Sequence, residues 1–286
     1  FVLGAGVAVG RTFGAAVGPA RRRVALRVCV DADATGNVDL ALLERALSDL
    51  KGGRVLVLGV DLYGRCCDYR AIGRLCRRYG AVYVSDSAEA VGAKTERGEP
   101  AGSAGLAAVY SFNGNKIVTT SGGGAVVTDS KRLADHVRKL AQQSREKCVW
   151  YEHREVGYNY RLSNLLAGVG LAQLAKLPAI LEARRRNHDF YRGLGLDCLP
   201  AGTGNCWLTV ALLSTRRERD RMLDRLAKAD IEARPVWKPM HLQPVFAGCP
   251  VYGGAVSEDL FARGICLPSG TGLAEDDLTR IADVLL

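Results

Sequence analysis

The chain has 286 residues, of which 48% are hydrophobic and 24% charged, and its formal net charge is +9. This length favours one large and one smaller domain, and the apolar fraction indicates a globular chain rather than a disordered one. The basic residues are dispersed and no aromatic-rich basic patch accompanies them, so we do not expect a nucleic-acid partner. A basic cleft would instead attract an anionic small molecule.

Nine cysteines occur without a Cys-x-x-Cys pair or a Cys/His cluster of metal-site spacing, so the sequence predicts no metal site. A reducing cytoplasm is the simplest location for such a chain. No apolar run approaches the length that spans a bilayer, and we expect no membrane partner. Residues 1–10 resemble the apolar part of a signal peptide but lack a basic start, and a core strand is the preferred interpretation.

Apolar runs alternate with amphipathic segments along the first part of the chain, which is typical of a mostly parallel α/β sheet. The predicted strands are short and rich in Val, Leu and Ala, and they lie at residues 26–30, 55–60, 81–84, 107–112 and 125–127. The predicted helices carry apolar residues on one face and follow capping residues, and they lie at 40–50, 69–79 and 131–140.

Beyond Tyr160 the pattern changes. Helices are predicted at 162–174, 178–194, 215–229 and from about Ala274, with strands at 206–213 and, as an edge strand, 231–234. The helix at 162–174 is rich in Leu, Ala and Gly, which suits a tightly packed interface. We therefore predict a large domain over residues 1–176 and a smaller C-terminal α+β domain over residues 177–286.

The run from Tyr110 to Asp129 is the most informative in the chain. Lys116 follows an apolar strand and precedes a glycine triplet and a second apolar strand. Lysine is costly to bury, so a lysine held between buried strands needs a partner or a chemical task. One such task is a Schiff base with an aldehyde cofactor. A lysine taken alone, however, is more often solvated.

Asp86 lies two residues after the apolar strand at 81–84, and ligands of open α/β sheets bind at the carboxyl ends of such strands. In pyridoxal-phosphate enzymes an aspartate contacts the pyridinium nitrogen. Ser111, five residues before Lys116, is a plausible phosphate ligand. Taken alone, Asp86 is equally compatible with a helix N-cap and Ser111 with an ordinary strand end, but the three residues in this order are more specific together.

Several segments resemble the DegT/DnrJ/StrS-type nucleotide-sugar aminotransferases, which are fold-type I pyridoxal-phosphate enzymes. The segments are Ser85–Ala93, Tyr110–Lys116, Thr119–Gly124 and Gly157–Asn164. The segment Arg234–Gln243 is similar to the branch that aminates the 4-keto group of UDP-linked 6-deoxy-amino sugars. The resemblance runs from about Thr12 to the C-terminus and implies a mostly parallel central sheet flanked by helices, followed by a smaller α+β domain.

The resemblance implies a role for each matched residue around the cofactor, pyridoxal 5′-phosphate. Lys116 would form the Schiff base and later move the proton, and Asp86 would contact the pyridine nitrogen. Glu89 would lie near the phenolic oxygen of the cofactor. Ser111 would hold its phosphate, and Phe13 occupies the place of an aromatic residue that stacks on its ring.

Further residues are implied to act across a homodimer and on the substrates, a nucleotide sugar and an amino donor. Asn159 would reach the phosphate of the neighbouring subunit's cofactor, and Arg161 lies close enough in the sequence to share that role or to contact substrate. His241 and Lys238 would approach the sugar nucleotide. The homodimer would then be the working unit.

The chain also departs from the family pattern. Family members begin with a longer segment that contains a Ser-Gly-Thr turn around the phosphate, whereas this chain begins at Phe1. We therefore expect a partial reading frame or a trimmed domain. Asp61 stands where a histidine is common in relatives.

The predicted function is the transfer of an amino group, from glutamate by resemblance, to a keto group of a nucleotide-linked deoxy sugar for glycan or secondary-metabolite biosynthesis. Two alternatives stay open. A dehydratase on the same fold typically has histidine in place of the Schiff-base lysine, and Lys116 is present. A remnant that only dimerises or binds sugar nucleotide would follow from a missing phosphate turn.

Overall fold

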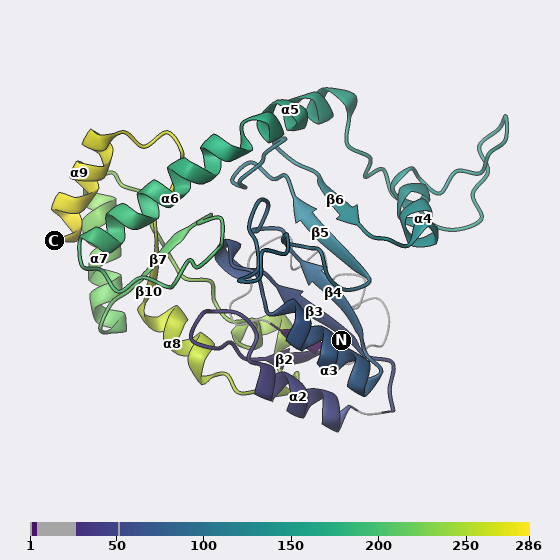
Figure 1. Ribbon diagram of the computed structural model, residues 1–286, viewed down its shortest axis with the longest axis horizontal. Helices are drawn as coiled ribbons and strands as arrows, with labels where there is room; N and C mark the ends of the chain where they lie inside the picture. The colour runs from purple at the N-terminus through teal and green to yellow at the C-terminus, as the bar shows by residue number, and fades with distance from the viewer. Residues whose placement is uncertain (1, 5–26, 51) are drawn as a thin grey trace.

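The computed structural model describes residues 2–4, 27–50 and 52–286, so the predicted stacking residue Phe13 lies outside the described residues. Within them the chain forms a seven-stranded sheet in the order β6-β5-β4-β3-β1-β2-β9 and a three-stranded sheet in the order β7-β10-β8 (Figure 1). All neighbouring strands of the larger sheet are parallel except β5 and β6. The predicted mostly parallel sheet is confirmed.

The strands of the larger sheet are β1 (Val2–Gly4), β2 (Val28–Val30), β3 (Leu56–Val60), β4 (Val82–Asp86), β5 (Ala107–Ser111), β6 (Gly124–Val127) and β9 (Val251–Tyr252). Strand β1 pairs with both β2 and β3, which confirms a core strand within residues 1–10. The strand predicted at 125–127 was expected to be buried, and this was wrong. It lies at the sheet edge and pairs only with β5, so Val126 and Val127 are exposed.

Among the described residues, a helix follows each of the strands β2, β3 and β6, and local signals fix where these helices begin. They are α2 (Leu40–Asp49), α3 (Tyr69–Tyr79) and α4 (Lys131–Ala141), and each starts after a side chain that accepts from a first-turn N–H, namely Asp39, Asp68 and Ser130. Helix α3 ends at Gly80, whose φ of 67° favours glycine. These helices match the predicted ones closely.

The C-terminal part contains α5 (Asn164–Ala175), α6 (Leu177–Gly193), β7 (Thr209–Leu212), α7 (Arg216–Lys228), β8 (Arg234–Pro235), α8 (Ala255–Arg263), β10 (Gly264–Leu267) and α9 (Glu275–Leu285). Strand β8 is an edge strand as predicted, but residues 231–233 have no regular structure. The sequence predicted neither β9, α8 nor β10. Because β9 pairs with β2, part of the C-terminal region completes the larger sheet, and the boundary at residue 177 stays a prediction.

The central part of the larger sheet is buried on both faces because its strands alternate side chains between two clusters. Val57 packs with Leu47 and Ile72 of α2 and α3, while Leu58 faces a second cluster that includes Val236 and Leu260 from the C-terminal part. The C-terminal part therefore closes the second face of the sheet.

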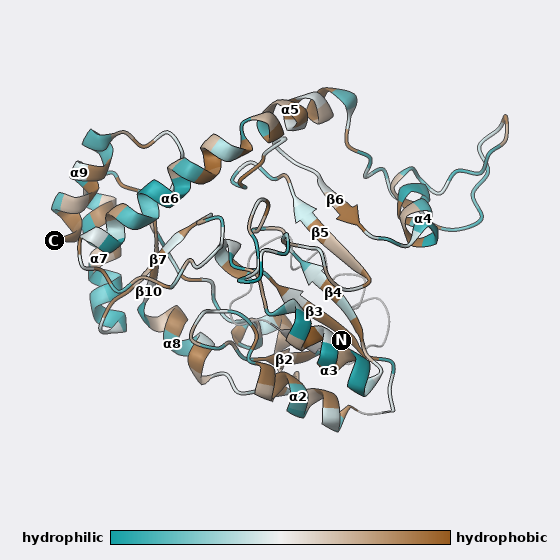
Figure 2. Ribbon diagram, viewed as in Figure 1, coloured by the Kyte–Doolittle hydropathy of each residue, from teal (hydrophilic) through white to brown (hydrophobic). Residues whose placement is uncertain are grey.

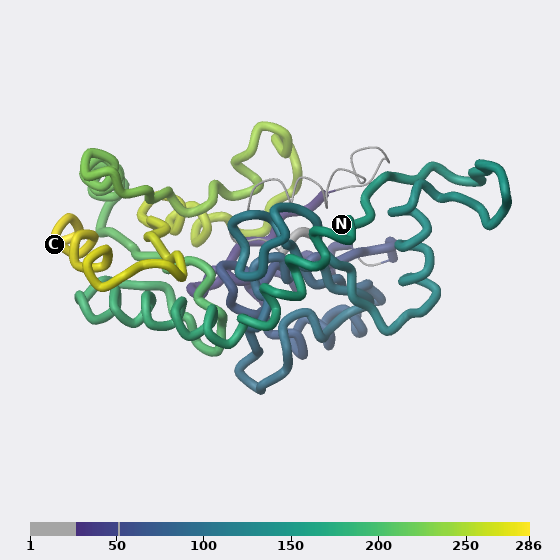
Figure 3. The backbone as a smooth tube through the Cα atoms, turned by 90° about the horizontal axis from the view of Figure 1, so that it is seen from above, coloured from purple at the N-terminus to yellow at the C-terminus, as the bar shows by residue number. Residues whose placement is uncertain are grey.

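One segment extends away from this body. Residues 142–163, between α4 and α5, reach outward beyond the sheet, as both the front view and the view from above show (Figures 1 and 3). We call this segment the arm. Helix α5, which follows it, is hydrophobic along much of its length (Figure 2). Within the described residues no single helix is both long and apolar enough to cross a bilayer, although α5 and α6 together are, with a bend of 62° between them.

Candidate active site

Lys116 lies in the loop between β5 and β6, and its side chain is buried, with the residue only 6% exposed. Ile117 and Val118, which follow it, belong to the core cluster and anchor this loop. The Lys116 Nζ lies 3.3 Å from Glu89 Oε1 and 3.9 Å from the centroid of the Trp207 ring. The lysine is therefore buried with a carboxylate and an aromatic face as partners, as its position in the sequence requires.

Asp86 is the last residue of β4 and is 3% exposed. Its Oδ1 accepts a hydrogen bond from the N–H of Ala88 at 3.1 Å. No helix follows within residues 87–92, which form turns, so the alternative of Asp86 as a helix cap is excluded. Burial raises the pKa of Asp86, while the Ala88 N–H and the charge of Lys116 oppose that rise.

Glu89 lies in the turn after β4 and is equally buried. Its Oε1 faces Lys116, and its Oε2 accepts from the backbone N–H of Tyr63 at 2.9 Å. Tyr63 presents this N–H from a left-handed conformation with φ of 53°. Burial raises the pKa of Glu89 to about 7, against the opposing effect of the Lys116 charge. This carboxyl group can therefore change protonation near neutral pH beside the amine.

Ser111 ends β5 and is buried at the same carboxyl edge of the sheet, since Asp86 pairs with Val109 two residues before it. Its Oγ accepts from the N–H of Asn113 at 3.3 Å. The carboxyl ends of β4 and β5 thus bring an acid and a hydroxyl to one edge, which is where open α/β sheets bind ligands.

The other predicted residues lie away from this cluster. Asn159 and Arg161 are exposed on the arm, and Lys238 is exposed before a short 3₁₀ helix (Met240–Leu242). The imidazole of His241 contacts Glu258 at 2.9 Å. Among the described hydrogen bonds and ion pairs, none joins these four residues to Lys116, Asp86 or Glu89, and their roles stay predictions.

Sequence reasoning missed the part that two residues near the site, Trp207 and Asp61, play in it. Trp207, which contacts Lys116, gave no signal, because it lies far along the chain. Asp61 was noted only as a departure, yet it is fully buried and its backbone N–H donates to the Asp86 carbonyl at 2.9 Å. Its Oδ2 accepts from Ser87 Oγ at 2.6 Å, and burial raises its pKa to about 6. Asp61 thereby braces the strand end that carries Asp86.

The family model of the DegT/DnrJ/EryC1/StrS aminotransferases matches residues 6–286. The chain belongs to this family. It is 42% identical to EpsN of Bacillus subtilis over 96% of the chain and 75% of that protein. It is 36% identical to a GDP-perosamine synthase of Caulobacter vibrioides over 90% of the chain and 72% of that protein.

Among solved structures, a DegT/DnrJ/EryC1/StrS aminotransferase from Brucella abortus aligns with a TM-score of 0.88 and 27% identity. The alignment covers 99% of the chain and 78% of the Brucella protein. The fold is therefore that of the fold-type I pyridoxal-phosphate enzymes, as the sequence predicts.

The buried polar groups of this DegT-family chain fit pyridoxal phosphate. An aldehyde needs an amine, which Lys116 offers, and a protonated ring nitrogen needs a carboxylate. Within the described residues, the only hydrogen bond that the Asp86 carboxylate accepts is the one from Ala88, so it can accept another. Ser111 adds a hydroxyl suited to a phosphate. The family and these donors agree, and the protein is a pyridoxal-phosphate-dependent sugar aminotransferase.

Proposed function

We propose that this protein transfers an amino group from glutamate to a keto group of a nucleotide-linked deoxy sugar. The observation that carries the proposal is the buried Lys116 amine, 3.3 Å from Glu89, at the carboxyl edge of the sheet that also carries Asp86 and Ser111. A lysine is costly to bury, and a buried amine beside a titratable acid suits the movement of a proton.

When bound, pyridoxal phosphate supplies an electron sink for the substrate carbon. The chain's own residues would do the remaining work. Asp86 would keep the ring nitrogen protonated, and Ser111 would hold the phosphate. Lys116 would carry the cofactor and, once released from it, take a proton from one carbon and return it to another. Glu89, with its pKa raised by burial to about 7, would share that proton with the amine.

The substrate class rests on relatives and on charge. The Caulobacter relative is named a GDP-perosamine synthase, and residues 234–243 resemble the branch that uses UDP-linked sugars. The diphosphate of either nucleotide would be attracted by the net charge of +9 and bound near Lys238 and His241. Biosynthesis of a cell-surface glycan or of a secondary-metabolite sugar would use the product.

We further propose that the working unit is a homodimer in the cytoplasm. The arm and α5 expose aromatic and apolar residues that a second copy would cover, among them Tyr158, Tyr160 and Leu165. Asn159 and Arg161 lie on the same arm, which supports their proposed reach toward the neighbouring cofactor.

All nine cysteines lie in the described part of the chain and are free thiols, as suits a reducing compartment. We keep the domain division at residues 1–176 and 177–286.

The proposal is tested by adding the reactants in turn to the full chain. Pyridoxal phosphate should give absorbance near the visible edge, glutamate should remove it, and a GDP- or UDP-linked 4-keto-6-deoxy sugar should restore it. The product should be an amino sugar by mass spectrometry. A deoxygenated sugar without nitrogen would instead identify a dehydratase, and no absorbance change at any step would identify a non-catalytic remnant.

A further inference from the structure

Trp207 contacts both Lys116 and the residue before it. The ring centroid lies 3.9 Å from Lys116 Nζ, and the indole Nε1–H donates to the carbonyl of Asn115 at 2.7 Å. Asn115 directly precedes Lys116, so one side chain touches both the amine and the backbone that carries it. Trp207 is 1% exposed, so both contacts are shielded from water.

The chemistry of the two partners of Lys116 is complementary. An ammonium is attracted to the negative face of an indole, and the attraction is stronger when both groups are desolvated. The face accepts no hydrogen bond in a fixed direction, so it restricts where the amine lies without fixing its N–H bonds. Glu89 Oε1 supplies the opposite charge at 3.3 Å. Together these contacts restrict a side chain that otherwise has large rotamer freedom.

Asn205 holds Trp207 in this position. Its Oδ1 accepts from the backbone N–H of Trp207 at 2.9 Å, and its Nδ2 donates to the carbonyls of Glu89 and Val91 at 2.8 and 3.0 Å. Any side chain at Gly64 would collide with this amide, because its Cβ would meet the Asn205 side-chain oxygen. One buried amide therefore ties Trp207 to the turn that carries Glu89, the other partner of Lys116.

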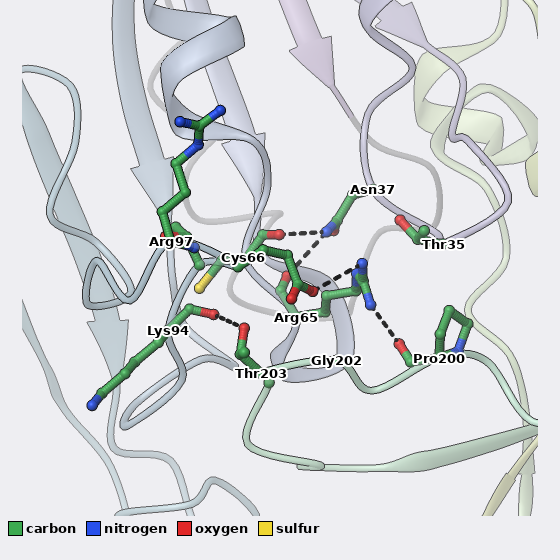
Figure 4. A network of polar contacts seen from close by, with 12 residues as sticks. Thr35, Asn37, Arg65, Cys66, Lys94, Arg97, Pro200, Gly202 and Thr203 are labelled. Atoms are coloured by element: carbon green, nitrogen blue, oxygen red, sulfur yellow. Dashed lines mark hydrogen bonds and ion pairs between the residues drawn. The ribbon is translucent and has the colours of Figure 1, made fainter.

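The loop that leads to Trp207 is also fastened to the larger sheet region. The Arg65 guanidinium donates to the Pro200 carbonyl at 3.1 Å, and the Thr203 hydroxyl donates to the Lys94 carbonyl at 2.7 Å (Figure 4). These bonds join segments more than a hundred residues apart in the chain, and they fix the start of the loop before it reaches Trp207.

Cys206, just before Trp207, has φ of 53°, a conformation that non-glycine residues adopt when their surroundings impose it. We propose that Trp207 is a positioning residue for Lys116, which holds the amine with its ring face and the adjacent backbone with its indole N–H. The proposal rests on the proposed role of Lys116. It assigns to the C-terminal part of the chain a direct share in the geometry of the reacting amine.

The first test measures coupling between the two side chains in the full chain without cofactor. Trp207→Leu, Lys116→Met and the double variant form a cycle of melting temperatures. We expect Trp207→Leu to lower the melting temperature more in the wild-type background than in the Lys116→Met background, and Trp207→Phe to keep most of the coupling. Additive effects would overturn the proposal. Trp237→Leu, in the same core region with its ring 6.3 Å from that of Trp207, is the matched control and should be additive with Lys116→Met.

The second test separates positioning from a merely structural role. Trp207→Leu should lower kcat about tenfold while leaving the KM for the sugar nucleotide unchanged, and Trp207→Phe should recover most of the loss. An unchanged kcat, or a KM that rises instead, would contradict the proposal. If borohydride reduction traps the cofactor on another lysine, the role of Lys116 fails, but the cofactor-free coupling still reports separately whether Trp207 holds its amine.

Discussion

The surroundings of Lys116 and the arm with α5 differ in how deeply their side chains are buried and in whether the chain itself provides their partners. Asp86 and Glu89, which lie near Lys116, are each 3% exposed. Their hydrogen-bond partners, the N–H groups of Ala88 and Tyr63, come from the same chain. On the arm and α5, Trp150 is 64% and Leu165 is 85% exposed. The first region is packed as a protein interior is, whereas the second presents large apolar groups to solvent.

This difference teaches which part of the site one chain can build. Asp86 and Ser111 come together within one chain, because the carboxyl ends of β4 and β5 meet at one edge, and Lys116 lies in the loop that follows β5. The arm residues Asn159 and Arg161 are exposed, and within the described residues no hydrogen bond or ion pair joins them to this cluster. Their exposed apolar neighbours support the proposal that a second copy of the chain covers the arm. Four predictions test this contrast.

The largest effect is expected for Lys116→Ala. Loss of the amine should lower transamination by more than about a thousandfold, because both the covalent link and the proton transfer need it. The overall fold should stay intact. Lys94→Ala, at an exposed lysine, is the matched control and should keep its activity. Borohydride labelling of a lysine other than Lys116 would show the assignment to be wrong.

Asp86→Asn should come next, with activity lowered by about a hundredfold and cofactor affinity reduced by roughly 1.5–3 kcal/mol, because the charge that holds the ring proton is lost. Single-turnover kinetics should place the loss in the proton-transfer step. The matched control is Asp68→Asn, since Asp68 caps α3 by accepting from Ala71 N–H at 2.9 Å. That variant should keep normal turnover with little loss of stability. Normal turnover in Asp86→Asn would contradict its catalytic role.

An intermediate effect is expected from mixing two inactive variants. If Asn159 completes the neighbouring site, Lys116→Ala and Asn159→Ala subunits should form hybrid dimers with one intact site each. Random exchange of equal amounts should recover about a quarter of the wild-type activity. Subunit exchange can be followed by mass spectrometry. Exchange of subunits without recovered activity would count against a shared site. The exposed arm would then have no role in completing the neighbouring active site.

The last prediction concerns the pH dependence of stability rather than activity. Burial raises the pKa of Glu89 to about 7 from an ordinary value of 4.5, so the folded state binds a proton more tightly than the unfolded state. The resulting stability is fully present below about pH 4.5 and is lost as the pH rises through about 7. Relative to Glu89→Gln, the cofactor-free wild type should therefore lose on the order of 3 kcal/mol across this range. Denaturant titrations at several pH values measure the difference, and a constant difference would refute it.

Features with local signals could be predicted from the sequence. Asp39, Asp68 and Ser130 each cap the predicted helix, because a short polar side chain bonds to N–H groups only two or three residues away. The location of Asp86 and Lys116 at the ends of strands could be predicted because each follows an apolar strand within a few residues. By contrast, the exposure of Val126 and Val127 depends on β6 having only one neighbour, which the composition of the strand does not reveal.

The amino-acid sequence by itself determined the family, the mostly parallel sheet and the positions of Lys116 and Asp86 near its carboxyl edge, because these depend on short runs of residues. The tertiary structure alone decided what surrounds the amine. Trp207 reaches Asn115 across 92 residues, and Asn205 reaches Glu89 across 116. Contacts at such separation leave no periodicity or spacing in the sequence, since they form only when the C-terminal part closes the second face of the sheet.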